Sequence, residues 1–113
     1  MSNYKTKQEN FWAGKFGNEY IERNQDKLLL ANNLYFFGKA LSTVSNIKNC
    51  IEFGANIGMN LKALKLLIPN LEAFGIEINE KASKKLENEI GRKNLYEGSF
   101  LDFIPHQRWD LVL

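Results

Sequence analysis

Two patterns of apolar residues alternate along this chain. Short, continuous apolar stretches predict strands at residues 49–53, 71–78, 94–97 and 111–113. Stretches in which apolar residues recur every three or four positions predict helices at residues 26–43, 58–67 and 80–90, with shorter helical pieces between residues 11 and 21. Because strands that alternate with helices are joined by right-handed crossovers, the pattern predicts an α/β fold around a parallel sheet.

The part before the first strand has a different character. Residues 1–9 are polar and are expected to be frayed. Asp26 can cap the helix at 26–43, and its mostly apolar face, which includes Asn33 and Phe36, is expected to lie against the sheet. The aromatic residues between 11 and 20 are expected to pack mainly into the core, with a location over a ligand pocket as the alternative.

A turn with two glycines follows the first predicted strand. Glu52 stands near the end of that strand, and Gly54 and Gly58 let the backbone turn tightly before the next helix. The dinucleotide pattern G-x-G-x-x-G fails here, because Asn56 and Met59 occupy its second and third glycine positions. The remaining pattern, E-x-G-x-x-x-G, fits a nucleoside with a cationic, phosphate-free tail. The alternative is a glycine-rich turn that binds nothing.

A second carboxylate ends the next predicted strand. Glu77 lies beyond Gly54 at about the distance where this kind of fold carries an acidic residue for the ribose hydroxyls. A carboxylate can accept hydrogen bonds from both hydroxyls of a ribose. The alternative is a solvated charge at a strand end, and the spacing from the glycine turn favours the ribose role.

The motifs together resemble a known enzyme family. Residues 51–58, 75–79, 98–100 and 109–113 are similar, in order and spacing, to the first four motifs of class I S-adenosylmethionine-dependent methyltransferases. Residues 9–24 resemble the N-terminal signature of the methylases associated with pseudaminic acid biosynthesis, a bacterial surface-sugar pathway.

The resemblance implies S-adenosylmethionine as the cofactor. It places Glu52 at the ammonium and sulfonium side, Glu77 at the ribose and Ile78 against the adenine ring. At the adenine edge Ser99 stands where many relatives have an acidic residue. The implied cofactor-binding residues are Glu52, Phe53, Gly54, Ala55, Asn56, Gly58, Glu77, Ile78, Gly98, Ser99 and Phe100.

The same resemblance implies a Rossmann-like sheet with strand order 3-2-1-4 and helices mainly on one face. Residues 1–45 are expected to form an N-terminal helical segment, and residues 46–113 the N-terminal half of a cofactor-binding domain. We expect such a truncated portion to be inactive by itself and to self-associate through its open sheet edge and uncovered face. No catalytic residue is assigned, and the methyl acceptor is expected to be a small molecule, a sugar or sugar nucleotide.

Two alternatives stay open: a noncatalytic fragment, and a Rossmann-like domain for another adenine nucleoside or a nicotinamide cofactor. Charge adds little, because 15 basic and 13 acidic residues leave a net charge of +2 and predict no nucleic-acid partner. The sequence shows no apolar run long enough for a membrane span and no signal peptide, which predicts a cytoplasmic protein. Cys50 is the only cysteine and His106 the only histidine, so neither a disulfide nor a metal site is expected.

Overall fold

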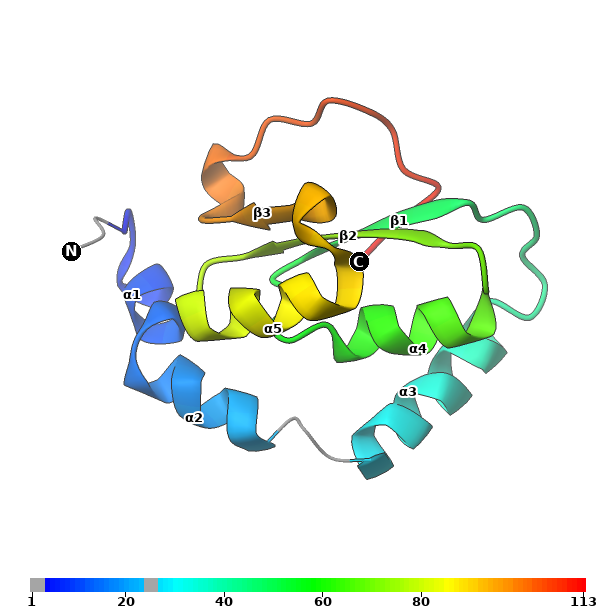
Figure 1. Cartoon of the computed structure of the whole chain (residues 1–113), viewed down its shortest axis with the longest axis horizontal. Coiled ribbons are helices and arrows are strands. Elements are labelled where there is room, and N and C mark those ends of the chain that lie inside the picture. Colours follow the sequence, from blue (N-terminus) through cyan, green and yellow to red (C-terminus); the bar gives the residue numbers. More distant parts are fainter. Residues whose placement is uncertain (1–3, 24–26) are drawn as a thin grey trace.

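The computed structural model describes residues 4–23 and 27–113 and contains a four-stranded parallel sheet (Figure 1). The strands are β1 (Asn49–Phe53), β2 (Glu72–Glu77), β3 (Leu95–Glu97) and β4 (Leu111–Val112). Their order is β3-β2-β1-β4, which confirms the predicted order. In the register of the two central strands Glu52 pairs with Gly75 and Phe53 with Ile76, so β2 runs one residue further to Glu77.

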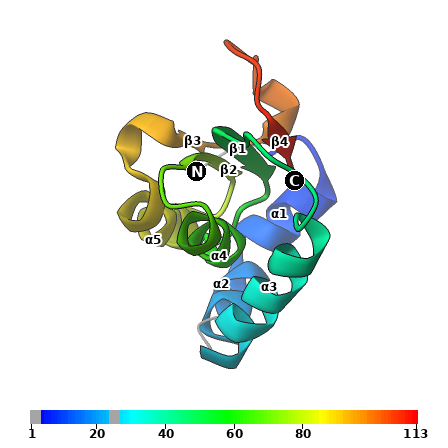
Figure 2. The same ribbon diagram turned by 90° about the vertical axis from the view of Figure 1, so that its right-hand side faces the viewer.

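Five helices and two short 3-10 turns complete the described part of the chain. They are α1 (Lys7–Ala13), α2 (Lys15–Arg23), α3 (Lys27–Ala40), α4 (Met59–Leu67), α5 (Glu80–Ile90), η1 (Arg92–Asn94) and η2 (Phe100–Asp102). Helices α2 to α5 lie on one side of the sheet, as predicted, and α1 lies beside the end of the sheet (Figure 2). None of the described helices is long and apolar enough to cross a membrane.

The main core lies between the sheet and helices α4 and α5. Cys50 of β1 and Ala73 of β2 face it, and they pack with buried leucines of both helices, Leu61, Leu64 and Leu86. Burying one leucine side chain stabilises a fold by about 1.5–3 kcal/mol. This apolar layer therefore fixes the two strands whose ends carry the carboxylates.

The opposite face of the sheet is smaller and largely aromatic. Ile51, Phe74 and Ile76 form its buried layer, and Phe103 and Trp109 from the segment between β3 and β4 pack over them. The expectation of an uncovered face is therefore wrong in part, because this segment covers it without forming a long helix (Figure 2). The sequence signal was the aromatic character of residues 100–109.

Helix α3 packs differently from the prediction. It lies beside α4 rather than directly on the sheet (Figure 1), and Phe37 is its buried residue. Phe36, expected on the packed face, is 63% exposed. The reason is that α3 is apolar on several sides, so periodicity alone could not select the face that packs. The predicted Asp26 cap lies outside the described residues.

The expectation of a frayed start is wrong for the residues next to α1. Thr6 caps this helix: its side chain accepts a hydrogen bond from the Glu9 N–H at 3.0 Å, and the Glu9 carboxylate accepts one from the Thr6 N–H at 3.2 Å. A reciprocal pair of this kind, T-x-x-E, stabilises the first turn of a helix. It places an ordered helix over one end of the sheet.

Candidate functional site

The glycine turn after β1 has three left-handed backbone positions. Gly54, Asn56 and Gly58 have φ values of 72°, 54° and 87°. Asparagine adopts this conformation more readily than most residues with a side chain, which explains how Asn56 can occupy a left-handed position of the turn. The N–H groups of Gly54 and Ala55 both donate to the Ile76 carbonyl at 2.9 Å. These bonds hold the turn against the end of β2.

Gly58 serves the packing of two helices. It precedes α4, and a Cβ atom at this position would meet Leu86 Cδ1 of α5 at 2.8 Å. It does not line the pocket described below. The second glycine of the motif is therefore required at the start of α4, because a side chain there would collide with α5.

Glu77, at the end of β2, is a buried carboxylate that is held by backbone groups. Only 6% of the residue is exposed. Its Oε1 accepts the Asn56 N–H at 2.6 Å and its Oε2 accepts the Asn79 N–H at 2.8 Å. Burial raises the pKa of Glu77, and the N–H groups of Asn79, Asn56 and Ile78 oppose that rise. The backbone of two loops therefore fixes both oxygens of this carboxylate.

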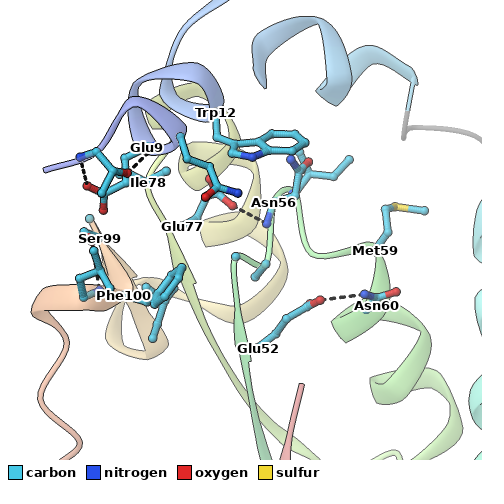
Figure 3. A pocket seen from close by; sticks show the side chains of 18 of the residues that line it. Glu9, Trp12, Glu52, Asn56, Met59, Asn60, Glu77, Ile78, Ser99 and Phe100 are labelled. Atoms are coloured by element: carbon cyan, nitrogen blue, oxygen red, sulfur yellow. Dashed lines mark hydrogen bonds between the residues drawn. The ribbon is translucent and has the colours of Figure 1, made fainter. Parts of the chain in front are cut away.

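Glu52, on the adjacent strand, is equally buried but has fewer partners. Its Oε2 accepts a hydrogen bond from Asn60 Nδ2 of α4 at 2.7 Å (Figure 3). Its Oε1 is buried and has no hydrogen-bond partner among residues 4–23 and 27–113. Burial raises the pKa of Glu52 to about 7; the Asn60 amide opposes this rise, and the nearby negative charge of Glu77 adds to it. A buried acceptor without a partner destabilises the protein unless a ligand or water binds to it.

Both carboxylates lie in the wall of one cavity of about 630 Å³ at the carboxyl ends of β1 and β2 (Figure 3). Cavities at this edge of an open parallel sheet are the usual ligand sites of such folds. The cavity brings together most of the predicted site residues, namely Glu52, Gly54, Ala55, Asn56, Glu77, Ile78, Gly98, Ser99 and Phe100. The sequence motifs from three separate segments therefore converge on one place.

Phe53 is the other predicted residue, besides Gly58, that does not line this cavity. Its ring packs against Phe100 and Phe103, with ring centroids 5.9 and 6.0 Å away. Successive side chains of a strand point to opposite faces, so Phe53 cannot share the position of its neighbour Glu52. The Phe53 ring therefore belongs to this aromatic cluster, and the assignment of Phe53 to the cofactor site stays a prediction.

The loop after β3 closes another side of the cavity. The Gly98 N–H donates to the Glu77 carbonyl at 2.9 Å, which joins this loop to the end of β2. The Ser99 hydroxyl accepts the Leu101 N–H at 3.0 Å and so caps η2. Lys5 forms an ion pair with Asp102 of η2, which links the start of α1 to the same loop.

The N-terminal helices form a part of the cavity that sequence reasoning left open. Helix α1 contributes Trp12 to the wall (Figure 3), together with Thr6, Gln8 and Glu9. Asn79 Nδ2 donates to the Trp12 carbonyl at 2.9 Å and to Asn18 Oδ1 at 2.8 Å. A Cβ atom on Gly17 would lie 1.7 Å from the Trp12 carbonyl oxygen. The buried amide of Asn79 and the missing side chain of Gly17 therefore hold α1 in place at the cavity.

Other wall residues were not among the predicted site residues: Leu29, Asn33, Ile57, Met59, Asn60, Ile76 and Leu101. For α1 a signal existed, since the T-x-x-E pattern of Thr6 and Glu9 marks the beginning of a helix. Asn33 carried a weaker signal as a polar residue among apolar ones. Asn60 gave none, because an asparagine in the first turn of a helix is unremarkable by sequence.

No protein-family model and no curated protein sequence matches this chain. Solved structures do match. The plantazolicin methyltransferase BpumL, crystallised with SAH, matches at 18% identity with a TM-score of 0.63, over 93% of this chain and 44% of its own. The sugar N-methyltransferase KedS8 from Streptoalloteichus matches at 16% identity and a TM-score of 0.64, over 99% of this chain and 42% of its own. DesVI of Streptomyces venezuelae matches at 14% identity and a TM-score of 0.59, over 96% of this chain and 43% of its own.

The chain has a Rossmann-like methyltransferase fold. It spans less than half the length of these solved structures. At identities below 20% the likeness concerns the fold, and function has to be argued from the site itself.

Proposed function

We propose that this chain binds S-adenosylmethionine and forms the donor-binding part of a methyltransferase. The observation that carries the proposal is the pair Glu52 and Glu77, two buried carboxylates on adjacent strands beside a left-handed glycine turn. The neighbour BpumL, with the same fold, was crystallised with SAH (S-adenosylhomocysteine), the demethylated form of this cofactor. The residues proposed to hold the cofactor are Glu52, Gly54, Ala55, Asn56, Glu77, Ile78, Gly98, Ser99 and Phe100.

The charge of the cavity wall fits the methionine half of this ligand. Glu52 presents a buried carboxylate whose Oε1 has no hydrogen-bond partner in the described part of the chain. An ammonium or sulfonium group near it would favour its ionised form and offset the cost of burial. A phosphate in the same place would face two carboxylates, so the wall disfavours a dinucleotide.

The partners of Glu77 fit a ribose. Each of its oxygens accepts one backbone N–H and retains capacity for another donor. The two bonds fix the carboxylate plane before a ligand arrives, so little side-chain entropy is lost on binding. Hydroxyl groups are suitable donors here, because the negative charge of Glu77 strengthens each bond.

The adenine ring is placed beside the loop after β3. Ile78 and Phe100 line the cavity there, and 52% of Phe100 is exposed. An aromatic base covering this apolar surface would remove it from water, at about 25 cal/mol per Å². Since the Ser99 hydroxyl already caps η2, we assign this residue to the edge of the ring through its backbone.

When bound, S-adenosylmethionine supplies a methyl group that is already activated on a sulfonium and leaves a neutral thioether. The contribution of this chain is to bind and orient the donor and to shield it from water. We assign binding roles alone to the described residues and no catalytic residue. We accordingly propose that the chain by itself binds the donor without transferring the methyl group.

For the acceptor we propose a small sugar or sugar nucleotide, in a cytoplasmic step of surface-sugar biosynthesis of the pseudaminic acid type. Two observations support this choice. Residues 9–24 resemble the corresponding methylases, and α1 from this segment lines the cavity. A neighbour in fold, KedS8, is a sugar N-methyltransferase. In this proposal residues 46–113 carry most of the donor site, and residues 1–45 close it.

Isothermal titration calorimetry with SAH and with NAD tests the donor assignment. We expect SAH to bind and NAD not to bind. Glu77→Ala should weaken SAH binding by about 1–3 kcal/mol, through loss of charged hydrogen bonds to the ribose. Glu72→Ala is the matched control, because Glu72 is an exposed carboxylate at the other end of the same strand. Preference for NAD, or equal effects of the two substitutions, would contradict the proposal.

A further inference from the structure

Three side chains form a hydrogen-bonded line from α3 to the end of β1. Asn33 Nδ2 donates to Asn60 Oδ1 at 2.9 Å, and Asn60 Nδ2 donates to Glu52 Oε2 at 2.7 Å. Asn33, Asn60 and Glu52 all line the cavity. We call these three residues the amide relay.

The direction of the relay is set by its last member. An ionised carboxylate only accepts hydrogen bonds, so the Asn60 amide must turn its nitrogen toward Glu52. Its carbonyl oxygen then faces α3, where only a donor can satisfy it. Asn33 supplies that donor through its Nδ2. Asn33 thus favours the orientation of Asn60 in which Asn60 stabilises a charged Glu52.

Among the described residues, the amides of Asn33 and Asn60, and no charged side chain, stabilise the ionised form of Glu52. Within residues 4–23 and 27–113, two titratable groups interact electrostatically with Glu52. The charge of Glu77 on β2 raises the pKa of Glu52, and the charge of Glu52 raises the pKa of Cys50 on β1, so neither group stabilises an ionised Glu52. The lysines of α3 and α4 have other environments: Lys39 lies over the Tyr35 ring, Lys65 pairs with Glu89, and Lys27 and Lys62 are exposed. Across the cavity, the Glu9 carboxylate caps its own helix.

We propose that Asn33 is a positioning residue for the ligand: acting through Asn60, it keeps Glu52 ionised and oriented to receive the cationic group of the bound nucleoside. This inference rests on the proposed function for its ligand, a nucleoside with an ammonium or sulfonium tail. It gives a residue of α3 a role in ligand binding, although α3 lies outside the motif of the glycine turn. Asn33 is assigned no contact with the reacting atoms and acts through its hydrogen bond to Asn60.

The substitution Asn33→Asp tests the direction of the relay with almost no change of shape. A carboxylate at position 33 would accept from Asn60, which turns the Asn60 oxygen toward Glu52. One of the two carboxylates must then hold a proton, and the more deeply buried Glu52 is the one that takes it. Asn32→Asp is the matched control, because Asn32 is exposed on the same helix and would carry the same added charge outside the relay.

The first measurement is a titration of SAH into the whole 113-residue chain by calorimetry between pH 6 and pH 9. We expect Asn33→Asp to weaken SAH binding about tenfold or more at pH 8 relative to Asn32→Asp. Binding should be lost as the pH falls and Glu52 takes up a proton, and in Asn33→Asp half of the binding should be lost at a higher pH than in Asn32→Asp. Equal affinities and equal pH profiles of the two variants would overturn the inference and leave the proposed function standing. Failure of the unsubstituted protein to bind SAH would instead overturn the proposed function, and with it the ligand named here.

The second measurement needs no ligand. A carbon-detected NMR titration follows the Glu52 carboxylate in the unsubstituted protein and in both variants. A rise in the pKa of Glu52 in Asn33→Asp, absent in Asn32→Asp, supports the relay, and an unchanged pKa would refute it. Asn33→Leu compared with Asn32→Leu repeats the test without added charge, so a folding defect of the aspartate variant cannot conceal the answer.

Discussion

Glu77 and Glu52 lie at the carboxyl ends of adjacent strands and are both buried, yet they are stabilised in different ways. Backbone N–H groups of two loops hold both oxygens of Glu77, whereas one side-chain amide holds a single oxygen of Glu52. A carboxylate that satisfies backbone donors is part of the fold, because those donors would otherwise be buried without a partner. A carboxylate with an unpaired buried oxygen costs stability in the free protein. The comparison therefore gives Glu77 a structural role beside its proposed role in binding, whereas for Glu52 the proposed role is mainly in binding.

The substitution Glu77→Gln should have the largest effect. A glutamine nitrogen would face one of the two backbone N–H groups, which leaves a buried donor without an acceptor. We expect the free energy of unfolding to fall by about 2–4 kcal/mol. Urea unfolding followed by circular dichroism measures it, with Glu72→Gln, at an exposed position, as the control. A loss below that of the control would show that the backbone bonds to Glu77 contribute nothing.

Glu52→Gln should act in the opposite direction. The folded-state pKa of about 7 lies above the ordinary 4.5, so the folded protein retains a proton between these values that the unfolded chain releases. The stability that Glu52 contributes by retaining this proton is fully present below about pH 4.5 and is lost as the pH rises through 7. We expect Glu52→Gln to raise the free energy of unfolding by about 1–3 kcal/mol at pH 8, with little gain at pH 4.5.

The same variant should lose most of its affinity for SAH, because the ammonium no longer meets a charge. Urea unfolding at the two pH values and calorimetry at pH 8 measure the two effects. Destabilisation at pH 8 together with unchanged SAH affinity would mean that Glu52 is a structural residue like Glu77.

A smaller effect is expected at the glycine turn after β1, in which the Asn56 N–H donates to the Glu77 carboxylate. Asn56 has a φ of 54°, and its side chain accepts the Ile57 N–H at 2.9 Å. Asn56→Ala should lower the free energy of unfolding by about 1 kcal/mol, since alanine lacks the acceptor and tolerates this conformation less well. Asn56→Gly should cost less than Asn56→Ala, because glycine removes the strain and loses only the hydrogen bond. The reverse ranking in urea unfolding would contradict the left-handed assignment of this residue.

The sequence predicted well where the signal was local. The buried parallel strands stand out as apolar runs, and a carboxylate inside such a run, as at Glu52 and Glu77, is conspicuous because burying it is costly. The end of α5 at Ile90 was readable from the glycine that follows it. The cofactor assignments of these residues themselves stay predictions.

What the sequence did not predict depends on contacts between distant segments. Asn33 and Asn60 are 27 residues apart, and only the packing of α3 on α4 turns two ordinary asparagines into a relay. Asn79 caps α5 by accepting the Ala82 N–H, and its Nδ2 also holds α1 at the cavity. The incorrect placement of Phe36 on the packed face of α3 had the same origin, because a pattern identifies an apolar residue without naming its neighbour.

The most direct test of the central claim uses the two tryptophan indoles as reporters, one at the cavity and one on the aromatic face of the sheet. Trp12 lines the cavity that holds Glu52 and Glu77, whereas Trp109 packs on the opposite face against Phe74. In nitrogen-15 NMR spectra, saturating SAH should shift the Trp12 indole signal and leave the Trp109 signal in place. A shift of Trp109 alone, or no shift of either signal, would contradict the location of the ligand site at the carboxyl ends of β1 and β2.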